Sequence, residues 1–262
     1  MKNIYSLIRL IPLFLFVSFL TGCDTERPLK IAVSKSGKNY LKWIHSADST
    51  IELIDLYSMK IDSAIYILSG CSGLLLTGGE DVYPGWYGKE GDTGRCTEFD
   101  RRRDSLDLQL IDKALQLGMP VIGICRGHQI LNVYLNGKLF VDLPSEFNNK
   151  ILHQCDDYLS CYHTIYIKPN TLLHQITELD SGVVNSNHHQ AIQMMSPLLL
   201  PNAYSGDGVI EGLEWQNPAR KGFLLGIQWH PERMDPSYAL SGKIRDEFIS
   251  RCRQFEPRKA WQ

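Results

Sequence analysis

Residues 121–127 read VIGICRG, and this short stretch determines how the chain folds. The apolar run that ends at Ile124 is typical of a strand buried on both faces. It stops at Cys125, and a helical pattern begins at once and continues to Leu135. A cysteine at such a strand-to-helix junction, with glycines on both sides, has the G-x-C-x-G form of a nucleophile elbow. The elbow would lift the sulfur out at the carboxyl edge of the sheet, where open α/β sheets bind ligands. The alternative is a buried structural cysteine beside a tight turn.

The alternation of strand and helix extends in both directions from this junction. It predicts strands over 29–33, 51–57, 74–76 and 121–124, and helices over 38–47, 61–68, 100–117 and 126–135. The second half is richer in predicted strands, over 164–167, 183–185, 198–204, 209–215 and 223–229, before a last helix over 236–251. This pattern predicts an α/β fold with a parallel sheet. The sequence shows no linker between residues 29 and 255, so one domain over 29–262 is the economical interpretation.

A cysteine nucleophile needs a base and a group that orients the base. The sequence QWHPE at 228–232, where another predicted strand ends, offers His230 and Glu232 for these roles. Pro231 favours an extended His230, which would put both side chains on the same side of the chain. The alternative is a polar turn after a strand.

An oxyanion would need backbone N–H donors near the cysteine. The N–H of Arg126, directly after the nucleophile, is one candidate. The other lies in Thr77-Gly78-Gly79, where a buried strand ends in two glycines that let the backbone approach a substrate closely. A glycine-rich loop over 80–99 follows, and loops of this length in a compact domain are usually functional.

Four segments together resemble a known family. They are LLTGGEDV at 75–82, GICRGHQILN at 123–132, VNSNHHQA at 184–191 and QWHPE at 228–232. Their order and form resemble class I glutamine amidotransferases, and within these the stand-alone gamma-glutamyl hydrolases. The most similar branch is that of the gamma-glutamyl-gamma-aminobutyrate hydrolases. Local departures are Tyr83, where the family often has Asp, and His128, where it often has Met.

The resemblance implies a flavodoxin-like three-layer α/β sandwich with a mostly parallel central sheet. It implies an acyl transfer that needs no metal and no organic cofactor, acting on a small gamma-glutamyl substrate through a thioester. It also implies roles for particular residues: a Cys125-His230-Glu232 triad, oxyanion donors at Gly79 and Arg126, and substrate contacts from Gln129, His189 and Gln190.

The first residues have the pattern of an export signal. Residues 1–22 combine Lys2 and Arg9 with a short apolar run, and Leu20-Thr21-Gly22-Cys23 follows. This segment resembles a bacterial lipoprotein signal, with lipidation of Cys23 and a spacer over 23–28. We therefore expect a lipoprotein anchored to a membrane outside the cytoplasm. The alternative is an uncleaved membrane helix, and if the signal interpretation is wrong the chain stays in the cytoplasm.

The composition and the expected location limit the kinds of partner that this protein could bind. The formal charge is -2, with 27 basic and 29 acidic residues, so there is no basic excess to bind nucleic acid. A synthase partner fed with ammonia is disfavoured outside the cytoplasm, where ATP is scarce. Three functions remain open: a hydrolase of small gamma-glutamyl amides, a hydrolase of gamma-glutamyl bonds in cell-wall peptides or poly-gamma-glutamate, and a glutaminase subunit or non-catalytic module.

Some features stay outside this interpretation. His153-Gln154-Cys155 and Cys161-Tyr162-His163 allow a zinc site, a Cys155–Cys161 disulfide or unpaired loop residues, and we favour the last. Residues 101–103 are three arginines, which we interpret as a solvated helix start rather than an anion site. The stretches around Trp43 and Tyr57 are interpreted as core.

Overall fold

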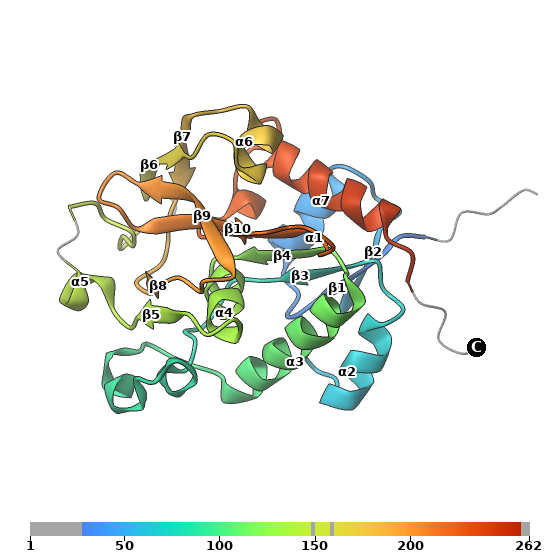
Figure 1. Ribbon diagram of the computed structural model, residues 1–262, viewed down its shortest axis with the longest axis horizontal. Coiled ribbons are helices and arrows are strands. Elements are labelled where there is room, and N and C mark those ends of the chain that lie inside the picture. Colours follow the sequence, from blue (N-terminus) through green and yellow to red (C-terminus); the bar gives the residue numbers. More distant parts are fainter. Residues whose placement is uncertain (1–27, 148–149, 158–159, 258–262) are drawn as a thin grey trace, which may run out of the picture.

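The structure is a computed structural model that describes residues 28–147, 150–157 and 160–257 (Figure 1). The predicted signal segment, Cys23 and all but the last residue of the predicted spacer lie outside the described residues. Within the described residues, no helix has the length and apolar character needed to cross a membrane.

One large sheet runs through the described chain, in the strand order β2-β1-β3-β4-β11-β10-β9-β6-β7. The five strands from β2 to β11 pair in parallel, and the strands beyond β11 pair antiparallel. In the parallel half the strands are β2 (Glu52–Asp55), β1 (Lys30–Val33), β3 (Gly73–Leu76), β4 (Val121–Ile124) and β11 (Leu224–Ile227). In the antiparallel half they are β10 (Ile210–Trp215), β9 (Leu199–Ser205), β6 (Tyr162–Ile167) and β7 (Ser181–Asn185). A small second sheet pairs β5 (Lys138–Phe140) with β8 (Ala191–Met194).

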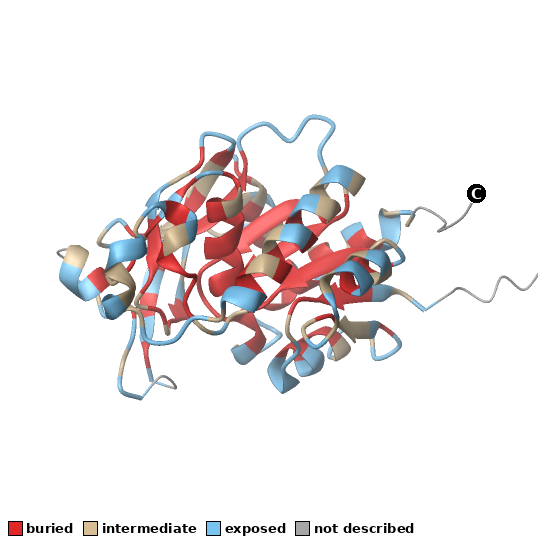
Figure 2. Ribbon diagram, turned by 90° about the horizontal axis from the view of Figure 1, so that it is seen from below, coloured by how far each residue is buried: buried red, intermediate tan, exposed pale blue. Residues whose placement is uncertain are grey.

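Helices cover both faces of the sheet and give the three layers that the sequence predicts (Figure 1). One face packs against α2 (Ile61–Leu68), α3 (Arg101–Leu117) and α4 (Arg126–Tyr134). The other packs against α1 (Lys38–His45), α6 (Leu172–Thr177) and α7 (Gly242–Gln254). Each face has its own apolar core, because strands of the parallel half alternate side chains between the two faces. Figure 2 shows the buried residues concentrated in the central sheet and on the helix sides that face it.

Helix α3, which follows the glycine-rich loop, begins and ends where its sequence predicts. The side chain of Asp100 accepts a hydrogen bond from the backbone N–H of Arg103, which caps the first turn of α3. Gly118 ends the helix in a left-handed conformation (φ 67°). The α/β fold class and most element positions predicted from the sequence are confirmed.

Some predictions fail locally. The pattern did not reveal β5, β8, α6 or α5 (Leu143–Glu146), because these elements are short and their partners are distant in sequence. The last helix begins at Gly242 rather than Pro236. The loop over 80–99 holds two 3-10 helices, Pro84–Tyr87 and Glu90–Arg95.

The two aromatic stretches differ. Trp43 is 2% exposed and donates from Nε1 to Ser241 Oγ at 3.1 Å, so it belongs to the core as predicted. Tyr57 is only half-buried, and its hydroxyl donates to Asp100 Oδ2 at 2.6 Å. Lys35 and Arg102 lie over its ring, so the core interpretation of Tyr57 is wrong.

Candidate active site

Cys125 stands between the end of β4 and the start of α4, in a conformation that few residues adopt. Its backbone has φ 52° and ψ −104°, and its N–H donates to Ile227 O at 2.8 Å. A Cβ on Gly123 would collide with the backbone of Gly127, and one on Gly127 with the carbonyl of Leu76. The two glycines of the elbow are therefore required by packing, and they allow the sharp turn that presents the cysteine at the carboxyl edge.

His230 follows β11 and lies next to Cys125 at the carboxyl edge of the sheet. The strands β3, β4 and β11 are adjacent, so the residues that follow them meet at one edge. A Cβ on Gly78 would lie 3.2 Å from His230 Cε1 and 3.5 Å from Cys125 Cβ, which places the ring and the thiol side by side. His230 Nδ1 is 2.9 Å from Glu232 Oε1. His230 Nε2 has no hydrogen-bond partner within the described part of the chain and is the nitrogen left for chemistry.

The backbone around His230 differs from the extended chain that the sequence suggests. Pro231–Arg233 form a 3-10 turn, and this turn brings the Glu232 carboxylate back to the ring. Asn185, at the end of β7, fixes the backbone of His230 from both sides. Its Nδ2 donates to His230 O at 2.9 Å, and its Oδ1 accepts from His230 N at 2.9 Å. Asn185 lies in one of the four motif segments, but nothing in the sequence assigned it this positioning role.

The charge state of His230 follows from its neighbours. Burial alone would lower the pKa of the imidazole, because it disfavours the charged form. The nearby negative charges of Cys125 and Glu232, together with the hydrogen bond between Nδ1 and Glu232, outweigh burial and raise the pKa of His230 to about 9. The charged imidazolium form of His230 is therefore favoured at neutral pH, next to the Cys125 thiol.

Two backbone N–H groups are placed as candidate oxyanion donors. Arg126 is the first residue of α4, where a helix leaves its N–H without an intrahelical partner. Gly79 follows β3 with φ 143°, a conformation that favours glycine. Arg103 donates from Nη2 to Gly78 O at 2.8 Å. Because the peptide between Gly78 and Gly79 is trans, the Gly79 N–H points away from Arg103.

Arg103 corrects the interpretation of the arginine run. Arg101 and Arg102 are exposed, but Arg103 is fully buried. Its guanidinium also donates to the carbonyl of Thr77 at 3.0 Å and to Glu80 Oε2 at 2.5 Å. These bonds compensate for burying the charge, and they hold the glycine turn in place.

The side chain of Arg126 points into the protein rather than toward the cysteine. It pairs with Asp104 and Asp107, which lie on α3, and all three side chains are buried. Burial raises the pKa of Asp104, although the nearby guanidinium opposes this. The network fastens the start of α4, and so the elbow, to α3.

The predicted substrate residues lie together beside this edge. Gln129 Nε2 donates to Gln190 O at 2.9 Å and to Gln228 Oε1 at 3.2 Å. Gln190 Oε1 accepts from Val82 N at 3.1 Å, which connects it to the 80–99 loop. His189 places Nε2 2.9 Å from Asp81 Oδ1 and Nδ1 3.2 Å from Asp142 Oδ1, so a direct substrate contact would have to displace one carboxylate.

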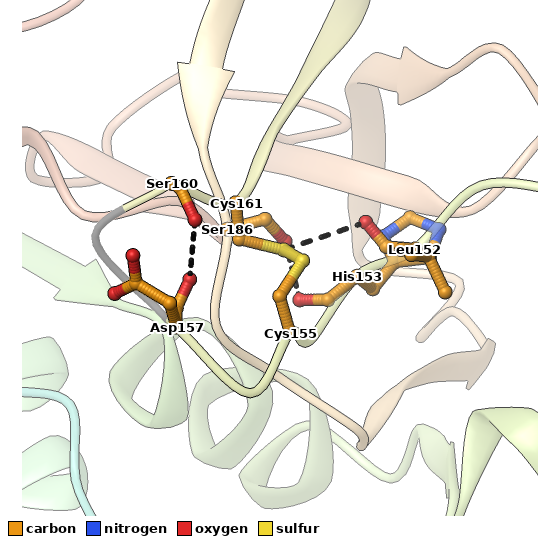
Figure 3. The surroundings of a disulfide bond; sticks show 7 residues. All are labelled: Leu152, His153, Cys155, Asp157, Ser160, Cys161 and Ser186. Atoms are coloured by element: carbon orange, nitrogen blue, oxygen red, sulfur yellow. Dashed lines mark hydrogen bonds between the residues drawn. A yellow bond between two sulfur atoms is a disulfide. The ribbon is translucent and has the colours of Figure 1, made fainter.

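The cysteines near residue 158 form a disulfide, Cys155–Cys161, with Cα atoms 5.6 Å apart (Figure 3). Our preference for unpaired residues is therefore wrong, and so is zinc ligation by these thiols. Ser186 Oγ donates to His153 O at 2.6 Å beside the disulfide. His153 and His163 turn inward to a different partner, the carboxylate of Glu211.

The model of the family described as peptidase C26 matches residues 23–232. The chain belongs to the peptidase C26 family. Among its relatives, Protein NtpR of Enterococcus hirae is 32% identical over 232 residues, which cover 88% of this chain and 94% of that protein. A gamma-glutamyl-gamma-aminobutyrate hydrolase of Escherichia coli K12 is 34% identical over 194 residues, covering 71% and 74%.

Solved structures support the fold of this peptidase C26 member. The glutaminase domain of Trypanosoma brucei CTPS superposes with a TM-score of 0.61 at 15% identity, covering 87% of this chain and 95% of that one. A glutamine amidotransferase from Thermotoga maritima gives 0.52 at 13% identity, covering 88% of each chain. At these identities the likeness shows the fold alone. The membership and the hydrolase relatives together support a hydrolase of the glutamine amidotransferase class.

Proposed function

We propose that this protein hydrolyses the gamma-glutamyl amide bond of small compounds of the gamma-glutamyl-gamma-aminobutyrate kind, through a thioester on Cys125. The observation that carries the proposal is the alignment of Cys125, His230 and Glu232 at one sheet edge. One ring nitrogen of His230 is held by Glu232, and the other has no partner within the described residues. The name of the 34% identical relative supports the choice of substrate class.

The reaction would proceed in two halves. The Cys125 thiolate attacks the γ-carbonyl carbon, and the resulting oxyanion accepts hydrogen bonds from the N–H groups of Gly79 and Arg126. When the tetrahedral species collapses, His230 Nε2 gives its proton to the leaving amine, and the γ-glutamyl thioester remains. His230 then takes a proton from water, the hydroxide attacks the thioester, and glutamate leaves with the thiolate restored. Glu232 holds the ring in place and stabilises its charged form.

Export is a second part of the proposal. The N-terminal signal motif with Cys23 suggests a lipid anchor outside the cytoplasm, and the Cys155–Cys161 disulfide is of the kind that persists in oxidising compartments. This placement favours a second candidate substrate, the gamma-glutamyl bond of cell-wall peptides or poly-gamma-glutamate. The chemistry at Cys125 would be the same.

A substrate panel tests the proposal. The full-length chain, purified with detergent, is incubated with gamma-glutamyl-gamma-aminobutyrate, glutamine, muropeptides and poly-gamma-glutamate, and glutamate or peptide release is measured. Faster release from the small amide than from glutamine supports the first substrate class. Release only from the muropeptides or the polymer supports the second, and no release from any compound contradicts the function.

A further inference from the structure

Three histidine rings converge on one carboxylate on the antiparallel side of the sheet. We call His153, His163, His188 and Glu211 the histidine cluster. Measured to Glu211 Oε1, His153 Nδ1 lies at 3.3 Å, His163 Nε2 at 3.2 Å and His188 Nε2 at 3.6 Å. Glu211 is fully buried, and each histidine is at most 6% exposed. None of these side chains takes part in the proposed reaction at Cys125.

The spacing of the cluster suits a metal ion. His153 Nδ1, His163 Nε2, His188 Nε2 and Glu211 Oε1 are buried, and by geometry none of them has a hydrogen-bond partner within the described residues. The potential ligand atoms of His153, His163 and Glu211 lie within 4.8 Å of one another. A tetrahedral zinc ion with bonds of about 2.0–2.1 Å needs ligand atoms about 3.3–3.4 Å apart. Two of the distances to Glu211 Oε1 lie close to this edge length.

The outer nitrogens of two rings are arranged as in metal-bound histidines. Such a ligand usually donates its second N–H to a carboxylate or carbonyl, which leaves the other nitrogen free to coordinate. His188 Nδ1 is 3.0 Å from Gln190 O, and His153 Nε2 is 3.3 Å from Asp207 Oδ1. Asp207 is itself held by Ser205 Oγ at 2.6 Å. The other nitrogen of each ring, His153 Nδ1 and His188 Nε2, is the one that lies near Glu211 Oε1.

The charges of the cluster are compatible with a bound cation. A buried carboxylate is costly unless a positive charge accompanies it. With a divalent ion bound by three neutral imidazoles, the carboxylates of Glu211 and Asp207 would balance its two positive charges.

From this geometry we infer a binding site for a divalent first-row transition metal ion, with zinc the best fit, formed by His153 Nδ1, His163 Nε2, His188 Nε2 and Glu211 Oε1. Nitrogen and carboxylate ligands in a tetrahedral arrangement are typical of zinc. His153, His163 and Glu211 would supply three ligands, and with His188 as the fourth, protein atoms would fill a tetrahedron, which is typical of a structural site rather than a catalytic one.

The site would stabilise the part of the protein that carries the predicted substrate residues. His163 lies on β6, Glu211 lies on β10, and His188 lies between β7 and β8, so one ion would tie three separate segments together. The carbonyl of Gln190 accepts from both His188 and Gln129. The metal would thus fix the wall beside the active site without touching the reacting atoms.

Metal analysis of the full-length chain tests this inference. The protein is purified with detergent and without chelator, and its metals are measured by mass spectrometry. We expect one zinc per chain, a lower melting temperature after chelation, and recovery on adding zinc. The His163→Gln variant should lose the metal. The His174→Gln variant removes a partly exposed histidine that pairs with Asp180, and it should keep the metal.

Cobalt gives a readout that needs no variant. Cobalt bound by three imidazoles and a carboxylate in a tetrahedron gives intense visible bands, whereas loosely bound, octahedral cobalt gives weak ones. The inference is overturned if the wild-type protein takes up no stoichiometric metal when zinc or cobalt is supplied. It is equally overturned if His163→Gln, still folded by circular dichroism, keeps the metal of the wild type.

Discussion

Two buried glutamates of this protein face histidine rings, and they differ in how many rings each one faces. Glu232 meets one ring, His230, whose other nitrogen is left facing the Cys125 thiol. Glu211 meets three rings, and all of them direct a nitrogen at the same oxygen. A single carboxylate–histidine pair can orient a base, while a carboxylate that meets several rings is, in our proposal, part of a metal site. Burial and charge alone therefore do not define the role of a glutamate in this fold.

The largest effect should come from the nucleophile itself. Cys125→Ser keeps the elbow but replaces the thiolate with a poor nucleophile, so we expect glutamate release to fall by at least about 10³-fold. The measurement is the rate of glutamate release from gamma-glutamyl-gamma-aminobutyrate. The melting temperature should hardly change, and retained activity would move the chemistry away from this residue.

Exchanging each glutamate for glutamine tests the comparison directly. Glu232→Gln should lower kcat by up to about 10⁴-fold, because the ring loses its orientation and its ionic partner. Glu211→Gln should instead lower the free energy of unfolding by about 1–3 kcal/mol, because a buried polar centre is disrupted. Steady-state kinetics and thermal melting of both variants decide the matter. Equal losses of kcat in both variants, with equal stability, would remove the distinction.

Removing the hydrogen bonds that position the His230 backbone should lower kcat less than removing the negative charge of Glu232. Asn185→Ala removes both hydrogen bonds to the His230 backbone, so we expect kcat to fall by about 10²-fold with KM little changed. Asn217→Ala is a suitable control, since Asn217 is exposed and its side chain accepts a hydrogen bond within its own turn. If Asn185→Ala raised KM alone, Asn185 would act on substrate rather than on the base.

The smallest predicted effect is on the pH dependence of stability and activity, which should reflect the raised pKa of His230. A histidine whose folded pKa is raised to about 9 stabilises the fold fully below its ordinary value, and this stabilisation is lost as pH rises through about 9. Activity should decline over the same range as the imidazolium loses its proton. Glu232→Gln should shift this decline to lower pH, because Glu232 is one cause of the raised pKa. An alkaline limb that stays in place would assign it to another group.

The sequence located the reactive edge because its motifs are local. Cys125 lies between glycines at a strand end, and His230 and Glu232 are two residues apart, so their relation needs no knowledge of distant contacts. Arg103 shows what was overlooked: it lies three residues before Leu106 and seven before Leu110, on the buried face of the same helix. This helical spacing from the two buried leucines indicates that Arg103 is buried, whereas the run of three arginines does not.

The histidine cluster could not be predicted in the same way. His163 and Glu211 lie on β6 and β10, which are separated by β9 in the sheet, and His188 comes from the segment after β7. Bringing them together depends on the order and register of antiparallel strands that are distant in sequence. The sequence placed His153 and His163 in a possible zinc site with Cys155 and Cys161, but it could not show that the two cysteines pair with each other or that His188 and Glu211 join the histidines.

The most direct test of the central claim is to capture the thioester. Full-length protein is mixed with gamma-glutamyl-gamma-aminobutyrate, quenched in acid during turnover, digested and analysed by mass spectrometry. The proposed mechanism predicts one added γ-glutamyl group on the peptide that contains Cys125, and none in Cys125→Ser. Glutamate release without any adduct on that peptide, or with the adduct on another residue, would contradict Cys125 as the nucleophile.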